Sequence, residues 1–193
     1  MSKLFSWFFI AMAGLSLTGC GEVSEPVTDF SDRSVIYGWI DIDDVPGSHL
    51  AALTIRQLQP ESPLPIALTA FLKLDGGYAF FTQVARPGIH RLGSVSTNGC
   101  LGRWCGSATN QYEIGLAAGG PPVVSTTRPG VYFIGNSALH LEQRFGFMVQ
   151  GEFSGSEATN GPSRRQLLQF LLDNLANINP TQIARMQAEL ARL

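Results

Sequence analysis

Three aspartates are the residues of this sequence best suited to hold a metal ion. Asp41, Asp43 and Asp44 stand close together beside a Val-Pro-Gly turn. Carboxylates near a turn can bind Ca²⁺, but the other ligands of a calcium-binding loop are missing from this stretch. Acidic residues at the end of a strand are ordinarily solvated, and we therefore expect no metal site and no cofactor.

Histidines and serines give little support for catalysis. His49, His90 and His140 each stand alone in strand-like segments, so we interpret them as half-exposed sheet residues. No nucleophile elbow, Walker loop or dinucleotide-binding fingerprint is present. The stretch Gly151–Gly155 (GEFSG) has its serine in the wrong place for an elbow. We expect a protein that is not an enzyme, and the alternative is an envelope enzyme acting on glycan or peptide.

The first 19 residues have the pattern of a secretion signal. Lys3 supplies a positive charge, the run Leu4–Leu17 is apolar, and Thr18 and Gly19 are small. This order of charge, apolar core and small residues is typical of a signal peptide. The apolar run is shorter than the roughly 20 residues of a membrane-spanning helix. We expect residues 1–19 to be removed from the mature protein.

The sequence Leu17-Thr18-Gly19-Cys20 resembles the lipobox of bacterial lipoproteins. The resemblance implies that Cys20 receives a diacylglyceryl group, that a peptidase cuts before it, and that the new amine is acylated. Three acyl chains would anchor the protein permanently, whereas a single chain binds a membrane only marginally. Gly21 stands where many Gram-negative lipoproteins that stay at the inner membrane have Asp, so the outer membrane, facing the periplasm, is favoured. The alternative is an ordinary signal peptide that happens to contain a cysteine.

With Cys20 assigned to lipid, Cys100 and Cys105 remain as a pair in an oxidising compartment. We predict a disulfide that closes a small loop. Two free thiols or half of a metal site are the alternatives, although no second cysteine pair or histidine motif completes such a site. The loop contains Arg103 and Trp104, which a disulfide could hold outward as a binding surface. Trp104 could equally fold back onto the edge of the sheet.

The composition fits one globular domain and argues against nucleic-acid binding. The chain has 193 residues, with 13 Lys and Arg against 15 Asp and Glu. Removal of residues 1–19 takes away Lys3, so 12 basic residues remain and the net charge becomes about −3. Nucleic-acid binding calls for a clustered basic face, which this sequence lacks. The remaining 174 of the 193 residues are enough for a real core.

A period of two begins at Val35 and indicates short strands. Val35–Ile42 places Ile36 and Ile40 on one face and Tyr37 and Trp39 on the other. The dipeptide Asp75-Gly76 predicts a hairpin turn. Further strands are expected over residues 49–58, 66–74, 78–84, 88–96, 112–117, 131–137, 138–142 and 145–153. Many short strands separated by turns predict an antiparallel β-sandwich or barrel, and we expect the sandwich.

One motif occurs twice. Arg86–Gly93 (RPGIHRLG) aligns with Arg128–Gly135 (RPGVYFIG). Pro-Gly suits a tight turn, and each copy ends at a glycine where a bulge or a close backbone approach is expected. We interpret the copies as two similar turns of one sandwich. The alternative is that the paired arginines contact a ligand.

A wider stretch is similar to the transthyretin-like, carboxypeptidase-regulatory-like module. The similarity runs from Gly38-Trp-Ile-Asp through Asp75-Gly-Gly-Tyr-Ala-Phe to Pro87-Gly-Ile-His-Arg-Leu. It covers residues 35–96, about a third of the chain, and His90 stands where the family usually has Tyr. The resemblance implies an Ig-like or transthyretin-like sandwich that binds, spaces or stabilises without catalysis.

The period becomes helical after Ser163. Ser163–Gln166 forms a capping box, and Asn179 with Pro180 begins a second helix. The first helix is apolar around more than one face and needs two partners. We expect the two helices to pack on the sandwich as its least stable element, so that truncation after Gly161 leaves a folded β domain.

These patterns predict four segments: a signal peptide (1–19), a lipidated Cys20 with a flexible tether (20–34), a β-sandwich domain (35–155) and a C-terminal helical hairpin (163–193). We expect a non-catalytic lipoprotein, bound to the membrane through its lipid, that binds or braces an envelope protein. A carbohydrate-binding module, which would expose a flat row of aromatic side chains, is a further possibility.

Overall fold

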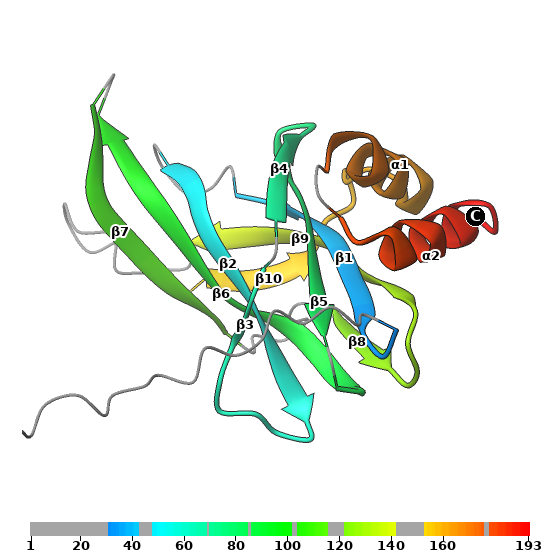
Figure 1. Ribbon diagram of the computed structural model, residues 1–193. Coiled ribbons are helices and arrows are strands. Elements are labelled where there is room, and N and C mark those ends of the chain that lie inside the picture. The colour runs from blue at the N-terminus through cyan, green and yellow to red at the C-terminus, as the bar shows by residue number, and fades with distance from the viewer. Residues whose placement is uncertain are drawn as a thin grey trace, which may run out of the picture.

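The computed structural model describes residues 31–42, 48–68, 70–84, 86–101, 104–115, 122–141, 153–175 and 178–193. At 48, 99–101, 104–115, 140, 141 and 153–157 it describes the backbone alone. Within these ranges the chain forms ten strands and two helices (Figure 1). They are β1 (Ser34–Asp41), β2 (Ser48–Gln59), β3 (Ile66–Ala67), β4 (Ala70–Leu74), β5 (Gly77–Val84), β6 (Gly88–Leu101), β7 (Trp104–Gly115), β8 (Val123–Thr126), β9 (Val131–Leu141), β10 (Phe153–Glu157), α1 (Arg164–Asn174) and α2 (Pro180–Leu190).

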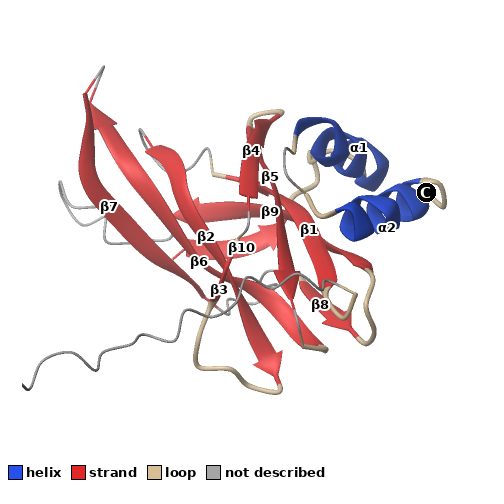
Figure 2. Cartoon of the chain, in the orientation of Figure 1, coloured by secondary structure: helices blue, strands red, loops and turns tan. Residues whose placement is uncertain are grey.

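The strands form two layers, and the helices add a third. Hydrogen bonding follows the path β3-β2-β6-β7-β10-β9-β1-β5-β4, with β8 beside β6. The layer of β2 and β6 lies on one side, and the layer of β1, β5 and β9 lies between it and the helices (Figure 2). The expected β-sandwich followed by a C-terminal helical hairpin is confirmed.

Two apolar cores hold these layers together. The inner core lies between the sheets and consists of Ile36, Ile40, Ile42, Leu50, Leu53, Ile55, Phe80, Val84, Leu92, Val95, Val124, Ile134 and Leu139. The outer core lies between the second sheet and the helices and consists of Val35, Tyr37, Trp39, Ala79, Phe81, Leu167, Leu168, Leu171 and Met186. The middle layer is therefore buried on both faces.

The alternation of side chains along β1 places residues of this strand in both cores. Ile36 and Ile40 enter the inner core, whereas Tyr37 and Trp39 enter the outer core. The predicted division into two faces is confirmed. The Trp39 indole N–H donates a 2.8 Å hydrogen bond to the Leu74 carbonyl, so its polar atom is satisfied within an apolar layer.

The sandwich contains parallel pairs beside its antiparallel ones. β1 pairs antiparallel with β5 but parallel with β9, and β10 pairs parallel with β7. A bulge lies in the β1–β9 ladder, where Gly38 faces Gly135 and Ile134 has no partner of its own. A Cβ on Gly38 would lie 2.7 Å from Ile134 Cγ2, and Gly135 has φ +116°. The predicted bulge at the end of the second Arg-Pro-Gly motif is confirmed.

The Asp75-Gly76 turn is also confirmed, because both residues have positive φ and Leu74 pairs with Gly77. The single strand expected over 66–74 is wrong. β3 pairs with β2, and β4 pairs with β5, so the chain crosses between sheets at this point. The two strands expected over 131–142 are one strand, β9. Of the strand expected over 145–153, residues 145–152 lie outside the described residues.

The helices begin where the sequence predicts. Ser163 and Gln166 form the capping box of α1, and Asn179 caps α2 with Pro180 in its first turn. The chain leading to α1 is held on β9, since the Asn136 side-chain amide donates to the Pro162 carbonyl at 3.0 Å. The expected packing of the helices on the sandwich is confirmed. Neither described helix is long and apolar enough to cross a membrane.

Candidate functional site

The residues singled out around the cysteines are described in part, and only by their backbone. Cys20 and Arg103 lie outside it. Cys100 and Cys105 are direct partners in the antiparallel β6–β7 ladder, and Trp104 pairs with Leu101. The structure therefore brings the two cysteine backbones opposite each other. Their side chains, and that of Trp104, are outside the description.

The other candidates are not brought together. Asp41 ends β1 half-buried, and Asp43 and Asp44 lie outside the described residues. Among the described residues no group of three or more His, Cys, Asp or Glu could hold a metal ion. His49 is exposed, whereas His90 is fully buried, which corrects the expectation of a half-exposed side chain. His90 pairs with Val124 of the neighbouring strand β8.

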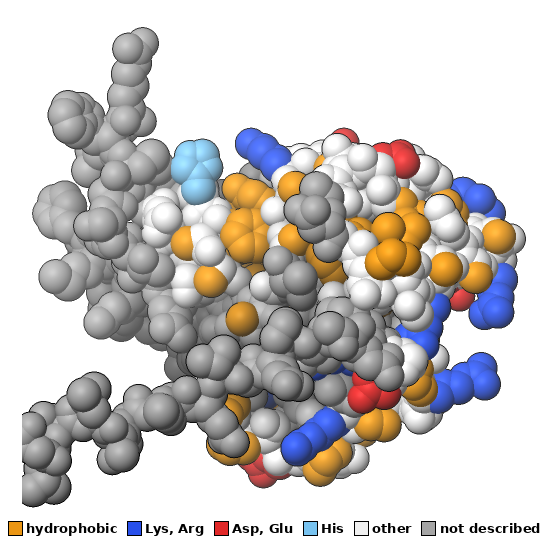
Figure 3. Space-filling view, viewed as in Figure 1, with side chains coloured by type: hydrophobic (Ala, Val, Ile, Leu, Met, Phe, Trp, Pro, Cys, Tyr) orange, Lys and Arg blue, Asp and Glu red, His pale blue; other side chains and the backbone are white. Residues whose placement is uncertain are grey.

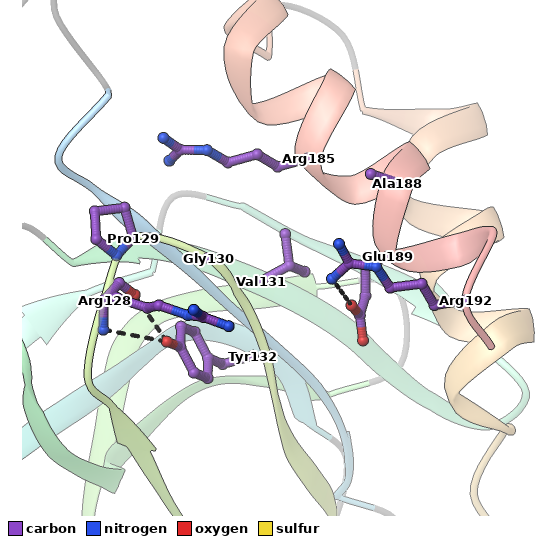
Figure 4. Close-up of a pocket in the computed structure, with 9 residues that line it drawn as sticks. All are labelled: Arg128, Pro129, Gly130, Val131, Tyr132, Arg185, Ala188, Glu189 and Arg192. Atoms are coloured by element: carbon purple, nitrogen blue, oxygen red, sulfur yellow. Dashed lines mark hydrogen bonds and ion pairs between the residues drawn. The ribbon is translucent and has the colours of Figure 1, made fainter.

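A cavity of about 540 Å³ lies between the β8–β9 turn and α2 (Figure 4). One wall is the turn at the second Arg-Pro-Gly motif with the start of β9, and the other is one face of α2 with Arg192, two residues beyond the end of the helix. The lining residues are Arg128, Pro129, Gly130, Val131, Tyr132, Arg185, Ala188, Glu189 and Arg192.

Hydrogen bonds fix the turn that carries Arg128. The Tyr132 hydroxyl donates to the Arg128 carbonyl at 2.7 Å, and the Ser34 hydroxyl donates to the same carbonyl at 3.1 Å. The Val35 N–H donates to the Gly130 carbonyl at 2.8 Å. The backbone of the turn is therefore pinned to β1 and β9, while the Arg128 side chain is exposed and extends toward α2 (Figure 4).

Arg185 ties the other wall to the residues that precede β1. Its guanidinium donates to the Arg33 carbonyl at 2.7 Å and to the Ser31 carbonyl at 2.6 Å. A guanidinium held at two points by backbone carbonyls loses little further freedom on meeting a ligand. The position of Arg185 beside the cavity is therefore set in advance.

Glu189 is the acidic residue of the lining, and two arginines balance it. Its carboxylate lies 3.3 Å from Arg164 and 3.8 Å from Arg192. Arg164 also lies over the Phe133 ring, with 5.4 Å to the ring centroid. Three arginines against one glutamate give the lining a net charge of +2, in a chain whose net charge is −2. Figure 3 shows Lys and Arg side chains gathered at the end of the molecule formed by the helices.

The same charges act on Tyr37, which lies beneath α1 in the outer core. Burial raises the pKa of the Tyr37 hydroxyl above its usual 10.0, Arg164 opposes this shift, and Glu189 adds to it. Tyr37 is therefore neutral at physiological pH. The charge of the site comes from the arginines and Glu189 alone.

This arrangement suits recognition of an anion. Guanidinium groups present forked N–H donors that match the oxygens of carboxylates and phosphates. Among the described residues that line the cavity there is no His, Cys or Ser, and the Tyr132 hydroxyl is already bonded to the Arg128 carbonyl. The lining therefore offers donors for binding but no activated nucleophile.

The sequence pointed to only part of this site. Arg128 belongs to the repeated motif, for which a ligand contact was the alternative interpretation, while its counterpart Arg86 is not in the lining. Arg185 and Arg192 were missed. They stand at i and i+7, with Glu189 at i+4, on one face of the predicted second helix. Their position on one helix face could have been predicted from this spacing. The sequence does not show that this face packs beside the turn that carries Arg128.

No protein-family model matches the chain, and no curated protein is significantly similar to it. A solved leucine-rich repeat protein from Bacteroides thetaiotaomicron aligns with 58% of this chain and 14% of its own length. The sequence identity is 9% and the TM-score 0.37. The chain thus matches a small part of that protein, and a likeness this weak carries no argument about function.

Proposed function

We propose that this protein is a lipid-anchored, non-catalytic envelope module that binds an anionic group of a partner in the cavity between the β8–β9 turn and α2. The observation that carries the proposal is that Arg128, Arg185 and Arg192 all line one cavity. The arginines come from two segments far apart in sequence. The fold therefore builds a cationic site out of a chain that is acidic overall.

Binding is favoured over catalysis by the state of the polar groups. A catalytic acid or base needs an available carboxyl or imidazole near the reacting atoms. Glu189, the carboxyl of the lining, is instead paired with Arg164 and Arg192. The cavity therefore resembles a receptor for a carboxylate or phosphate.

The anchor rests on the Leu17–Cys20 lipobox, and Gly21 supports an outer-membrane location facing the periplasm. Cys20→Ser should leave an uncut precursor that no longer incorporates radiolabelled palmitate, because only the thiol can form the thioether. The unchanged chain, labelled in parallel, is the control. Palmitate incorporation at the same level in the Cys20→Ser variant would remove the anchor from the proposal.

The anion site is tested by titrating the folded protein with inorganic phosphate and following Tm. A ligand that binds only the native state stabilises it by about 2.7 kcal/mol at a concentration 100 times Kd. The unchanged chain should show a saturable rise in Tm that is absent with sodium chloride at equal ionic strength. Arg128→Gln/Arg192→Gln should lose most of this rise.

The matched control removes the same charge elsewhere. Arg56 and Lys73 are exposed and lie outside the cavity, on β2 and β4. Arg56→Gln/Lys73→Gln should keep the full phosphate response. An equal response in both double variants would mean that phosphate acts through the overall charge, and the cavity would not be an anion site.

A further inference from the structure

We propose that the ligand of this cavity is the phosphate headgroup of an anionic phospholipid in the membrane to which the chain is anchored. This inference rests on the proposed anion site and on the lipid at Cys20. It assigns the site a second role, which is to dock the domain on the membrane surface in one orientation.

Both walls of the cavity are hydrogen-bonded to residues at the start of the described fold, where the tether ends. Arg185, from α2, bonds the carbonyls of Ser31 and Arg33. The turn on the other wall receives hydrogen bonds from Ser34 and Val35. Four of the first five described residues are thus hydrogen-bonded to residues that line the cavity, which lies at the lipid-proximal end of the fold.

The length of the tether limits how far this end can stand from the membrane. Ser31 lies 11 positions after Cys20. A fully extended chain of that length spans at most about 40 Å, and a random coil of it spans about 17–20 Å. A domain of this size has a diameter of about 40 Å, from its expected radius of gyration. At the random-coil length, which is about half of this diameter, the cavity lies nearer the bilayer than the opposite end of the sandwich does.

Charge favours contact with an anionic surface at this end. The lining carries a net charge of +2. Arg164 lies next to the lining, because it forms an ion pair with Glu189. Arg128 is exposed, and the Arg192 side chain is 78% exposed, so both can reach a headgroup. Basic side chains near a bilayer are attracted to anionic lipids within about one Debye length, roughly 10 Å at 0.1 M salt.

A free phosphate and a lipid phosphate present the same chemistry, so the two sources must be separated. The described fold begins at Ser31, and a chain that starts at position 20 with Cys20→Ser keeps every described residue. This unlipidated chain is sedimented with vesicles of phosphatidylcholine alone or of phosphatidylcholine with added phosphatidylglycerol. Inorganic phosphate is titrated into the same protein in a separate arm.

The chain should bind the vesicles that contain phosphatidylglycerol, more weakly at higher salt, and should not bind phosphatidylcholine alone. Each basic side chain near an anionic surface contributes roughly fivefold to affinity, so Arg128→Gln/Arg192→Gln should weaken vesicle binding about 25-fold. Circular dichroism confirms that this variant is folded. Arg56→Gln/Lys73→Gln should weaken binding by much less.

Equal binding to both kinds of vesicle, or an equal loss in both double variants, would overturn the headgroup proposal. Saturable binding of inorganic phosphate without any binding to the vesicles would overturn it as well, and would leave the proposed anion site in place. If the protein bound neither the vesicles nor inorganic phosphate, the proposed anion site itself would be overturned.

Discussion

The Gln83 side-chain amide donates a 2.8 Å hydrogen bond to the side-chain carbonyl of Gln182, across the junction between β5 and α2. Gln182 is fully buried, and its own Nε2 has no partner among the described residues. A polar contact at the edge of the outer core therefore fixes where α2 sits on the sheet. That placement brings Arg185 and Arg192 to the β8–β9 turn.

Gln83→Ala should lower the free energy of unfolding by about 1–3 kcal/mol, because it leaves the buried Gln182 carbonyl without its donor. Urea denaturation at neutral pH measures the change. Gln187→Ala, at an exposed position of the same helix, should stay within about 0.5 kcal/mol of the unchanged chain. If the two variants are equally stable, the Gln83–Gln182 bond does not form in solution.

The helices should prove to be part of the core, in contrast to the sequence-based expectation that the sandwich folds without them. Truncation after Gly161 would expose Tyr37, Trp39 and Phe81, which are now 0–3% exposed. We expect a truncated chain that aggregates or lacks a cooperative urea transition. A soluble truncated chain with cooperative unfolding would show that the sandwich is independent after all.

A point substitution tests the same packing without deleting a segment. Leu171 is fully buried in the outer core, and Leu171→Ala should cost about 2–5 kcal/mol of stability through lost burial and the cavity it leaves. Arg165→Ala, on the exposed side of α1, should change stability by no more than about 0.5 kcal/mol. Urea midpoints of the two variants, measured side by side, give the comparison.

The sequence predicted local structure well because local rules decide it. The alternation in β1, the Asp75-Gly76 turn and the Ser163 cap depend on residues within a few positions of each other. It could not predict the parallel pairing of β1 with β9, or the change of sheet between β3 and β4. A period of two tells which side chains share a face, but not which strand lies alongside.

The candidate site shows the same limit. Arg128 was noticed through its motif, yet its partners across the cavity lie more than 50 positions away. Whether Arg128 or Arg86 meets the second helix depends on the order of strands in the sheet, which no local pattern encodes. Arg185 and Arg192 could be placed on one helix face, but the structure was needed to bring that face to the turn.

The buried His90 should make the protein less stable in mild acid. Burial lowers the pKa of His90 below its usual 6.5, and a hydrogen bond involving the Gly88 backbone opposes this shift. The unfolded chain therefore binds the proton more tightly than the native state does. The stabilising contribution is complete above about pH 6.5 and is lost as the pH falls from there toward the lowered native pKa.

Urea unfolding between pH 7.5 and pH 5 measures this loss. His90→Leu should flatten the decline, because it removes the buried titrating group. His49→Gln changes an exposed histidine and should leave the decline as it is. A His90→Leu variant that loses stability as steeply as the unchanged chain would show that other groups cause the acid sensitivity.

The last prediction concerns Cys100 and Cys105, which are paired across the β6–β7 ladder. Directly opposed residues in an antiparallel pair have Cα atoms about 4.5–5.5 Å apart, within the roughly 4.4–6.8 Å that a disulfide spans. We therefore expect the oxidised mature protein to contain this bond. A chain carrying Cys20→Ser, purified without reductant and then denatured, should contain no titratable thiol.

Breaking the bond should weaken the hairpin, because closure of a small loop is worth about 2 kcal/mol in the chain-entropy description. Cys100→Ser/Cys105→Ser should lower the urea midpoint, and added reductant should lower the midpoint of the unchanged pair to about the same value. The double variant itself should not respond to reductant, which separates the bond from any general effect of the reagent. Two reactive thiols per denatured chain, with no reductant present, would rule the disulfide out.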